Sequence, residues 1–392
     1  MTLVEKLLSE IPAAEYQQLV ATRRDLHRHP ELAFEERRTA SIAAARLREM
    51  GLSPREGVGR TGVVADSGAG GPRVMLRADM DALPLDEAST EPYASQTPGH
   101  MHACGHDGHV AMGLAVARRL TANPPGAPLR FLFQPAEEGQ GGAQACFDDG
   151  ALEGVGSAFG LHLWSPLPVG KIGVNRGALM AAVDHFEIDV EGRGGHGAAP
   201  HETNDPIVAA ARIVDALQSV VAREISPLEA AVVTIGSIHG GTAFNIIPGS
   251  VRLTGTARSF SEATGKALPE KIRRIVAGTA AACGVEAAVR YHRVNSATVN
   301  DPKMADLVIE TAVRLLGEEN VETDTRTLGG EDMSVFLNAV PGCFFFVGCA
   351  REGELRPHHS PRFDMDERAL AVGTAVMEAV LREAARRLGA PG

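Results

Sequence analysis

The stretch Leu129-Arg130-Phe131-Leu132-Phe133-Gln134-Pro135-Ala136-Glu137-Glu138 places two adjacent glutamates directly after an apolar run that predicts a β-strand. The glutamates lie between Cys104-Gly105-His106 upstream and His162 downstream, and His162 also follows a strand-like run. A thiol, imidazoles and a carboxylate near the ends of successive strands offer a divalent ion a full set of ligands. One carboxylate is left over for proton transfer. The pattern therefore predicts a metal-dependent hydrolase.

The bulk composition excludes several classes of function. The chain has 392 residues, 44% hydrophobic and 22% charged, and this length predicts two domains. Its formal net charge of −11 leaves no dominant basic surface, so we expect no nucleic-acid partner. We expect no membrane partner, because no uncharged apolar run approaches the roughly 18 residues that a span needs. Glu5, Lys6 and Glu10 favour an N-terminal amphipathic helix over a signal peptide, which predicts a cytoplasmic protein.

Alternating strand and helix patterns predict an α/β layer with a mostly parallel sheet. Strands are expected at residues 62–66, 74–77, 129–133, 158–163 and 344–347. Helical patterns cover residues 14–52, with a stop at Gly51, and then 110–120, 143–147, 304–316 and 367–387.

A separate unit of βαββαβ order can be read after residue 178, with strands expected at 184–191, 231–238, 251–257 and 285–291. Asp205 can cap its first helix, and Pro206 suits the first helical position. Gly284 ends the second helix, with Pro269 expected near the start of that helix. This order is that of a ferredoxin-like domain. We therefore expect residues 179–294 to be inserted into a mixed-sheet α/β domain formed by residues 1–178 and 295–392.

The segment His100-Met101-His102-Ala103-Cys104-Gly105-His106-Asp107-Gly108-His109 concentrates metal-ligand residue types before a helix. Cys104 and His106 are two positions apart, so they can face one ion or a pair, and Gly105 allows a tight turn between them. Not every imidazole can be a ligand, and His102 and His109 are expected to orient ligands or to pack. The alternative interpretation makes Cys104 a nucleophile with a histidine as its base.

Asp79 and Asp81 close the strand that contains residues 74–77, at alternate positions that put both carboxylates on one side. One of them could accept a hydrogen bond from a ligand histidine and so orient its ring. The alternative is an ion pair between Asp79 and Arg77, or a solvated turn.

Glu137 and Glu138 point in different directions, so one can bind metal while the other accepts the proton of a water and delivers it to the leaving nitrogen. Taken alone, the pair could also be an exposed acidic turn, and His162 or His359 could be ordinary core or surface histidines. Together, the candidate ligands exceed what one tetrahedral ion takes, which implies two metal ions. These ligands are Cys104, His106, Glu138, His162 and His359.

Nearly the whole chain resembles the aminoacylase and carboxypeptidase-like metallopeptidases. Within them it is similar to the amidohydrolase branch that includes hippurate hydrolases, N-acetyl-amino-acid deacetylases and indoleacetyl-amino-acid hydrolases. The motifs that carry the resemblance are Leu26-His27-Arg28-His29-Pro30-Glu31-Leu32, residues 77–84, 102–109 and 134–139, Gly160-Leu161-His162, residues 195–201, Phe244-Asn245-Ile246-Ile247-Pro248 and Gly329-Gly330-Glu331-Asp332-Met333.

The resemblance assigns roles to the site residues. It implies that Cys104, His106, Glu138, His162 and His359 hold two divalent ions, with manganese, zinc, nickel and cobalt all open. Glu137 is implied to be the general base, and Asp81 to support it from behind the metals. Asp79 stands where the wider family has a ligand histidine, and Cys104 supplies a ligand instead.

The resemblance also implies that the inserted ferredoxin-like domain is a lid and dimerisation domain, which predicts a homodimer or higher homo-oligomer. His196 is implied to reach the substrate carbonyl, often from the partner subunit. Asn245, Arg258 and the backbone of the loop at Gly330 are implied to bind the substrate's carboxylate, because a guanidinium pairs bidentately with a carboxylate. The alternatives are that Asn245 caps a turn and that Arg258 is a surface strand residue.

The implied reaction is hydrolysis of a small N-acyl-L-amino acid, such as hippurate or an N-acetyl-amino acid, to a carboxylate and a free amino acid. A metal-bridged hydroxide would attack, with Glu137 as general base and acid. The alternatives are a metallo-dipeptidase or aminopeptidase on the same scaffold, a thiol hydrolase that uses Cys104 with His106, and a non-catalytic metal-binding protein. The sequence leaves open the acyl group, the amino-acid side chain and whether His196 acts within one subunit.

Overall fold

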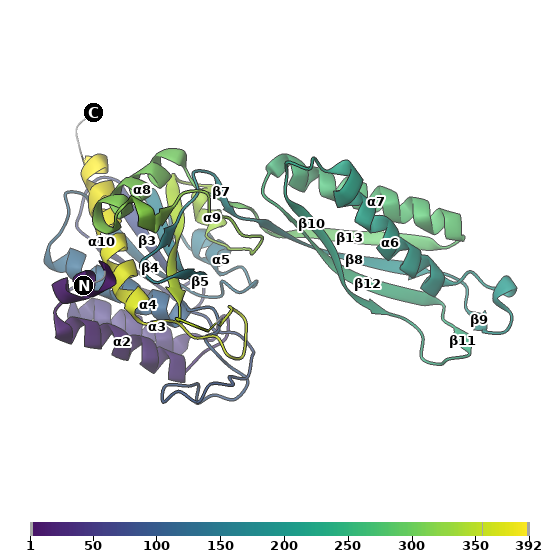
Figure 1. Cartoon of the computed structure of the whole chain (residues 1–392), viewed down its shortest axis with the longest axis horizontal. Helices are drawn as coiled ribbons and strands as arrows, with labels where there is room; N and C mark the ends of the chain where they lie inside the picture. The colour runs from purple at the N-terminus through teal and green to yellow at the C-terminus, as the bar shows by residue number, and fades with distance from the viewer. Residues whose placement is uncertain (1–2, 355, 390–392) are drawn as a thin grey trace. The chain divides into compact units, whose positions relative to one another are not determined.

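The computed structural model describes residues 3–354 and 356–389, which divide into two compact units (Figure 1). The large unit contains the described residues of 3–179, 298–326 and 332–389, and the small unit contains residues 180–297 and 327–331. No helix among the described residues is both long enough and apolar enough to cross a membrane.

An eight-stranded mixed sheet forms the centre of the large unit, in the order β1-β2-β4-β3-β5-β16-β6-β15. Its inner strands β4, β3, β5 and β16 are mutually parallel, whereas β1 and β2 add antiparallel pairs at one edge. Every residue of β4 is buried, which explains the continuous apolar run that predicted it. The strands are β1 (Arg55–Val58), β2 (Gly62–Ser67), β3 (Arg73–Asp79), β4 (Leu129–Gln134), β5 (Val155–Pro168), β6 (Ile172–Gly173), β15 (Val321–Glu322) and β16 (Gly342–Ala350).

Several helices pack against this sheet and share one continuous apolar core with it, whereas others pack on those helices (Figure 1). The helices are α1 (Leu3–Glu10), α2 (Ala13–Arg28), α3 (Arg37–Glu49), α4 (His106–Ala122), α5 (Gly142–Asp148), α8 (Pro302–Leu316), α9 (Ser334–Leu337) and α10 (Arg368–Gly389). Helix α4 is almost wholly buried, and Gly113 lets it approach the sheet closely, because an added Cβ would lie 3.1 Å from Phe133 and 3.2 Å from Ala78. The single helical region expected over residues 14–52 is wrong, since residues 29–36 separate α2 from α3. Pro30 disfavours helical geometry at His29, and Phe34 adopts a positive φ of 64°.

The small unit is a four-stranded antiparallel sheet in the order β10-β12-β8-β13, with helices α6 and α7 on one face (Figure 1). The strands are β8 (Ala182–Glu191), β10 (Ala231–His239), β12 (Ser250–Ser259) and β13 (Glu286–Asn295), and the helices are α6 (Pro206–Glu224) and α7 (Glu262–Cys283). The ferredoxin-like arrangement is confirmed. Two short pairs complete the strand inventory: β9 (Gly195–His196) with β11 (Ile246–Ile247), and β7 (Ala178–Met180) with β14 (Thr298–Val299).

The helix boundaries of the small unit follow their capping residues, with one correction. Asp205 accepts hydrogen bonds from the amides of Ile207 and Val208, and Gly284 ends α7 in the left-handed conformation with a φ of 67°. The expectation that Pro269 lies near the start of α7 is wrong, because the Ser261 side chain caps the helix earlier and leaves the proline inside it.

Candidate metal centre

The candidate ligands of the large unit lie on loops and strands of the parallel part of its sheet. Glu137 and Glu138 follow the carboxyl end of β4, and His162 is part of β5, which is separated from β4 by β3 in the sheet. Cys104 and His106 flank Gly105 at the start of α4, where Gly105 has a φ of 93°. The carboxyl ends of parallel strands are where open α/β sheets bind ligands.

The five candidate ligands form two groups that share Cys104. Cys104 lies with His106 and His162 in one group, and with Glu138 and His359 in the other, with the ligand atoms of each group within 4.8 Å of one another. The Cys104 Sγ is 3.4 Å from His162 Nε2, and His359 Nε2 is 3.2 Å from Glu138 Oε1. His359 has a positive φ of 59°, a strained conformation for a residue other than glycine.

The donor atoms suit a divalent cation. His106 Nδ1 donates to the Asp81 carbonyl at 2.9 Å and His162 Nδ1 donates to the Leu163 carbonyl at 2.6 Å, so Nε2 is the nitrogen of each ring that a metal ion can take. His106 Nε2 is buried and has no hydrogen-bond partner among the described residues. Two buried imidazoles, a thiol, a carboxylate and the more exposed His359 are a donor set that manganese, zinc, nickel or cobalt can occupy.

Burial and the neighbouring charges together set the protonation of these groups. Burial lowers the pKa of His106, but Asp79 and Asp81 outweigh it and raise this pKa to about 10, so a metal ion has to displace a proton from that ring. Burial, followed by the nearby Glu138 and Glu137 carboxylates, raises the pKa of the Cys104 thiol well above its usual range. Burial and His109 hold the pKa of His162 well below its usual range, which keeps the ring neutral. A thiolate at Cys104 therefore needs a neighbouring cation, and the thiol-hydrolase alternative lacks an activated nucleophile.

Asp81 holds the backbone of the glutamate pair. Its Oδ1 and Oδ2 accept the amides of Glu137 and Glu138, each at 3.0 Å, and its Oδ1 is 3.3 Å from His106 Nδ1. Ala136, which precedes the pair, has a positive φ of 53°. The chain therefore turns sharply after β4, and Asp81 fixes the direction in which both glutamates leave it.

Asp79 takes part in the ion pair that sequence reasoning offered as an alternative. Arg77 Nη1 donates to Asp79 Oδ2 at 2.7 Å, and His109 Nδ1 donates to Asp79 Oδ1 at 2.5 Å. His109 Nε2 in turn accepts the Leu163 amide at 2.9 Å, so His109 packs beneath His162. Asp79 therefore orients His109, whereas His106 is held by the Asp81 carbonyl. Burial lowers the pKa of His102 to about 4, and both of its ring nitrogens are buried.

Asp332 is a residue of this site to which sequence reasoning gave no role. Its backbone amide donates to Glu137 Oε1 at 3.4 Å, and its carboxylate accepts from Arg77 Nη2 at 2.8 Å and from Gln134. Burial raises its pKa to about 6, against the lowering effect of Arg77. Asp332 therefore links the glutamate pair to the buried Arg77.

The four remaining predicted site residues belong to the small unit, where they form two pairs. His196 is exposed on β9 opposite Ile246, and the Gly197 amide donates to the Asn245 carbonyl at 2.8 Å. Arg258 on β12 pairs in register with Val183, and an added Cβ on Gly330 would lie 2.1 Å from a methyl group of Val183. Arg258 Nη1 is buried with no hydrogen-bond partner among the described residues, and burial lowers the pKa of this guanidinium.

The structure therefore brings Arg258 and Gly330 together, and separately His196 and Asn245. β12 extends from Ser250, close in sequence to β11, to Ser259. Eight residues of extended strand separate Ser250 from Arg258, which is roughly 26 Å. Asn245 and Arg258 of one copy of the small unit are therefore too far apart to bind the same substrate carboxylate.

A buried arginine, Arg23, was also missed, although the sequence carries a signal for it. Leu19, Arg23, Leu26 and His27 are the buried residues of α2, so a charged residue occupies the apolar face of an amphipathic helix. A charge in that position is rarely left unpaired.

The fold and the donor set define a metal-dependent hydrolase, and known proteins agree. Residues 75–383 match the model of Peptidase family M20/M25/M40. The N-acetylcysteine deacetylase of Bacillus subtilis is 41% identical over 370 residues, covering 92% of this chain and 95% of that protein. Thermostable carboxypeptidase 2 of Saccharolobus solfataricus is 40% identical over 383 residues, covering 95% and 96%.

A solved structure agrees as well. The YXEP protein of Bacillus subtilis, described as a dinuclear metal-binding peptidase from the M20 family, has a TM-score of 0.82 at 36% identity, covering 95% of this chain and 98% of that one. The chain belongs to peptidase family M20/M25/M40, and it is a metal-dependent amidohydrolase.

Proposed function

We propose that the protein hydrolyses N-acyl-L-amino acids, of the hippurate or N-acetyl-amino-acid kind, to a carboxylate and a free amino acid. The observation that carries this proposal is that the carboxylates of Glu137 and Glu138 have different partners. Glu138 lies with Cys104 and His359, whereas the Glu137 carboxylate, which also lies near His106 and Glu138, accepts the Asp332 amide. One carboxylate can therefore serve as a ligand while its neighbour handles a proton.

Two divalent ions, held by the two ligand groups that share Cys104, would polarise the scissile carbonyl and lower the pKa of a water. Glu137 accepts the proton of that water and returns it to the leaving nitrogen. Asp81 keeps Glu137 and Glu138 pointing in their separate directions through the two amide hydrogen bonds. The buried surroundings of Glu137 limit competing proton exchange with bulk water.

Substrate recognition falls to the small unit in this proposal. Arg258 and the backbone at Gly330 bind the substrate's carboxylate, and the buried, unpaired Nη1 of Arg258 supports that role. His196 reaches the substrate carbonyl with Asn245 beside it. Since these two pairs lie at opposite ends of β12, we propose that His196 comes from a second copy of the chain.

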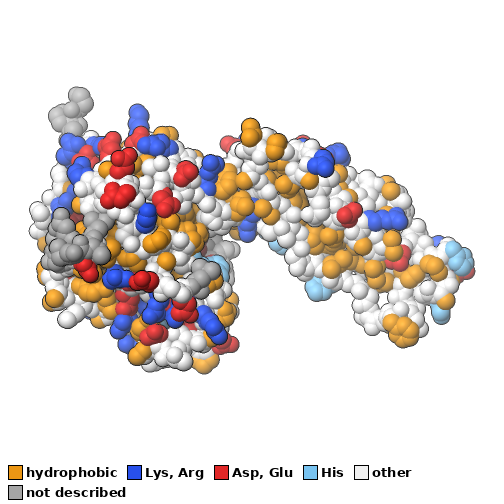
Figure 2. All heavy atoms as spheres, viewed as in Figure 1, with side chains coloured by type: hydrophobic (Ala, Val, Ile, Leu, Met, Phe, Trp, Pro, Cys, Tyr) orange, Lys and Arg blue, Asp and Glu red, His pale blue; other side chains and the backbone are white. Residues whose placement is uncertain are grey.

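A homodimer or higher homo-oligomer is therefore part of the proposal. Phe244 and Ile246, next to His196, are 102% and 58% exposed, and hydrophobic side chains are visible on the surface of the small unit (Figure 2). β10 is an edge strand of its sheet, so it offers unpaired backbone groups as well. A second copy would cover both features.

The test is a substrate panel on the protein reconstituted in turn with manganese, zinc, nickel and cobalt. The panel compares N-acetyl, benzoyl and indoleacetyl amino acids with dipeptides that have a free amino terminus. We expect turnover of the acylated compounds, and we expect Glu137→Gln to abolish it without loss of bound metal. Retained turnover in Glu137→Gln would contradict the role of that residue.

A second candidate function is cleavage of dipeptides or other short peptides on the same scaffold. The relative named Thermostable carboxypeptidase 2 favours it. Faster turnover of dipeptides than of every acylated amino acid in the panel would decide for this candidate. A complete lack of turnover with all four metals would instead favour a non-catalytic metal-binding protein.

A further inference from the structure

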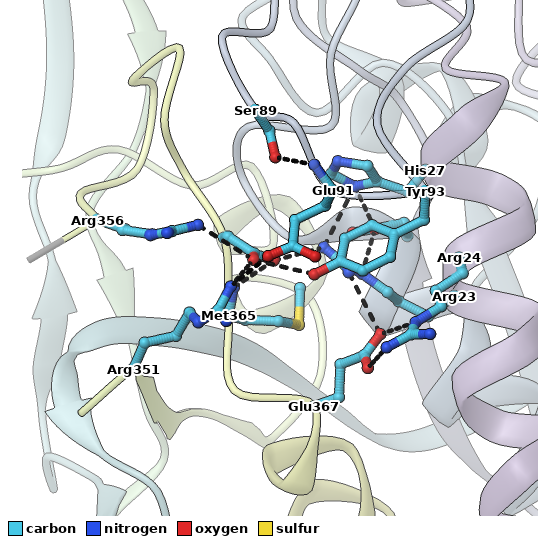
Figure 3. Close-up of polar contacts among 12 residues, drawn as sticks. Arg23, Arg24, His27, Ser89, Glu91, Tyr93, Arg351, Arg356, Met365 and Glu367 are labelled. Atoms are coloured by element: carbon cyan, nitrogen blue, oxygen red, sulfur yellow. Dashed lines mark hydrogen bonds and ion pairs between the residues drawn. The ribbon is translucent and has the colours of Figure 1, made fainter. Parts of the chain in front are cut away.

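Arg23 of α2 is fully buried in the large unit and contacts acidic side chains from two distant parts of the chain (Figure 3). Its Nε donates to Asp107 Oδ2 at 2.8 Å, and its Nη2 donates to Asp364 Oδ1 at 3.3 Å. Its Nη1 reaches Glu367 Oε1 at 3.4 Å. One guanidinium therefore joins α2, the first turn of α4 and the loop that precedes α10.

Asp107 is held from two sides. His27, one helical turn after Arg23, donates from Nδ1 to the same Asp107 Oδ2 at 2.8 Å, and its Nε2 lies 3.3 Å from Glu87 Oε1. Asp107 is fully buried, and Arg23 and His27 lower its pKa against the opposing effect of burial. Asp107 directly follows the candidate ligand His106.

Asp364 is the second acidic centre of the network. Tyr93 donates its hydroxyl to Asp364 Oδ2 at 3.0 Å, and Arg351 and Arg356 pair with the same oxygen (Figure 3). Asp364 Oδ1 also accepts the Met365 amide at 2.9 Å. These contacts fix Asp364 and Met365, shortly before α10.

Both ends of the network reach segments that carry candidate ligands. Asp107 belongs to the segment of Cys104 and His106, and Asp364 belongs to the loop of His359. The two segments also touch directly, because the His359 amide donates to the Ala103 carbonyl at 2.8 Å. Two ligand groups that share Cys104 need these segments in register. The backbone hydrogen bond and the packing of Phe363 against Gly105 hold the segments together, and ion pairs add directional contacts to them.

We propose that Arg23 is a positioning residue for the metal centre, which holds the Cys104–His106 segment and the His359 loop in register through Asp107 and Asp364. The inference rests on the ligand set of the proposed function. A planar guanidinium suits this role because its separate N–H groups donate in fixed directions, so that the two carboxylates are held at a set spacing. A lysine at this position would supply charge without that geometry.

A general contribution to folding stability is the competing explanation, and the chain offers a matched control for it. Arg130 is another buried arginine of the large unit, on β4. It pairs bidentately with Asp66 and donates to the carbonyls of Ala151 and Glu153. Within the described part of the chain, Arg130 contacts neither a candidate ligand nor a residue adjacent in sequence to a candidate ligand.

The experiment measures zinc and manganese affinity of the metal-free protein by competition with a chromophoric chelator, together with its thermal midpoint. We expect both Arg23→Gln and Arg130→Gln to lower the midpoint. Only Arg23→Gln should weaken metal binding, roughly tenfold to a hundredfold, as loss of a residue that orients ligands does elsewhere. Wild-type affinity in Arg23→Gln, or equal weakening in Arg130→Gln, overturns the proposal.

A second variant covers the case in which Arg23→Gln does not fold. Asp364→Asn keeps the shape of the side chain, and the position lies five residues from His359. Weakened metal binding in this variant supports the proposal, and wild-type affinity overturns it. Glu138→Ala is measured in parallel. If Glu138→Ala retains its metal, the ligand set of the proposed function is wrong; if it loses metal while Arg23→Gln and Asp364→Asn bind normally, only the positioning role is wrong.

Discussion

The two units of the molecule differ in where their charged side chains lie. In the large unit, Arg23, Arg77 and Asp79 are at most 2% exposed and form ion pairs inside the core. In the small unit, most ion pairs are solvent-exposed, such as Arg290 with Glu187, whose side chains are 53% and 32% exposed, and the pair of Arg293 with the buried Asp184 is an exception. The small unit buries an almost wholly apolar core instead.

This difference indicates what the buried charges are for. Removing an ion pair from water costs several kcal/mol per ion, and an apolar replacement is often as stable. The small unit builds a compact structure with few buried charges, of which Asp184 is one. The buried pairs of the large unit are concentrated around the candidate metal centre, where ligand orientation requires directional hydrogen bonds.

The largest effect is expected from breaking a buried pair in the large unit. Arg77→Met would leave the buried carboxylates of Asp79 and Asp332 without their cation. We expect a loss of about 3–5 kcal/mol in the free energy of unfolding, since an uncompensated buried charge is strongly destabilising. Denaturant titration of the metal-free protein measures it. A loss below about 1 kcal/mol, typical of an exposed pair, would remove the contrast between the units.

The small unit should respond most to changes in its apolar core. Ile272 of α7 is fully buried among the side chains that join the two helices to the sheet. Ile272→Ala should cost about 2–5 kcal/mol, because it removes buried methyl groups and leaves a cavity. Hydrogen exchange followed by mass spectrometry would locate the loss of protection. Because the candidate ligands belong to the large unit, we expect Ile272→Ala to bind as much metal as the wild type. A loss of metal equal to that of Glu138→Ala would contradict this expectation.

Much of both units follows from the sequence, because local signals decide it. The strands of the small unit alternate in burial, and Asp205 and Gly284 mark helix ends by chemistry that depends only on neighbouring residues. The ligand residues were likewise proposed from residue type and spacing.

What the sequence did not show depends on contacts between distant residues. Arg23 meets Asp364 across 341 positions, and Asp332 meets Arg77 across 255. No local pattern specifies such a pair. The separation of Arg258 from Asn245 was equally hidden, since it follows from the direction of β12 in the sheet.

A smaller effect is expected at the cap of α6. Asp205→Ala removes the side chain that accepts the Ile207 and Val208 amides, and should cost about 1 kcal/mol. Asp205→Asn is the matched control, because asparagine also caps helices well. Thermal unfolding of the three proteins would measure the effect. Equal losses in both variants would show that the carboxylate charge, and not the hydrogen bonds, supports the helix end.

The smallest effect is expected on the open sheet face, at Arg290 of β13. Arg293 of the same strand lies on the opposite face, toward α7, and serves as the comparison. Arg290 pairs with Glu187 and Asp189 in solvent, so Arg290→Met should leave the unfolding midpoint unchanged within error. Arg293 instead pairs with Asp184, whose side chain is fully buried and also accepts the Tyr291 hydroxyl. Arg293→Met should therefore lower the midpoint, because it leaves that carboxylate with one partner fewer. Equal unfolding midpoints for Arg290→Met and Arg293→Met would mean that burial of the carboxylate does not decide how much an ion pair stabilises this unit.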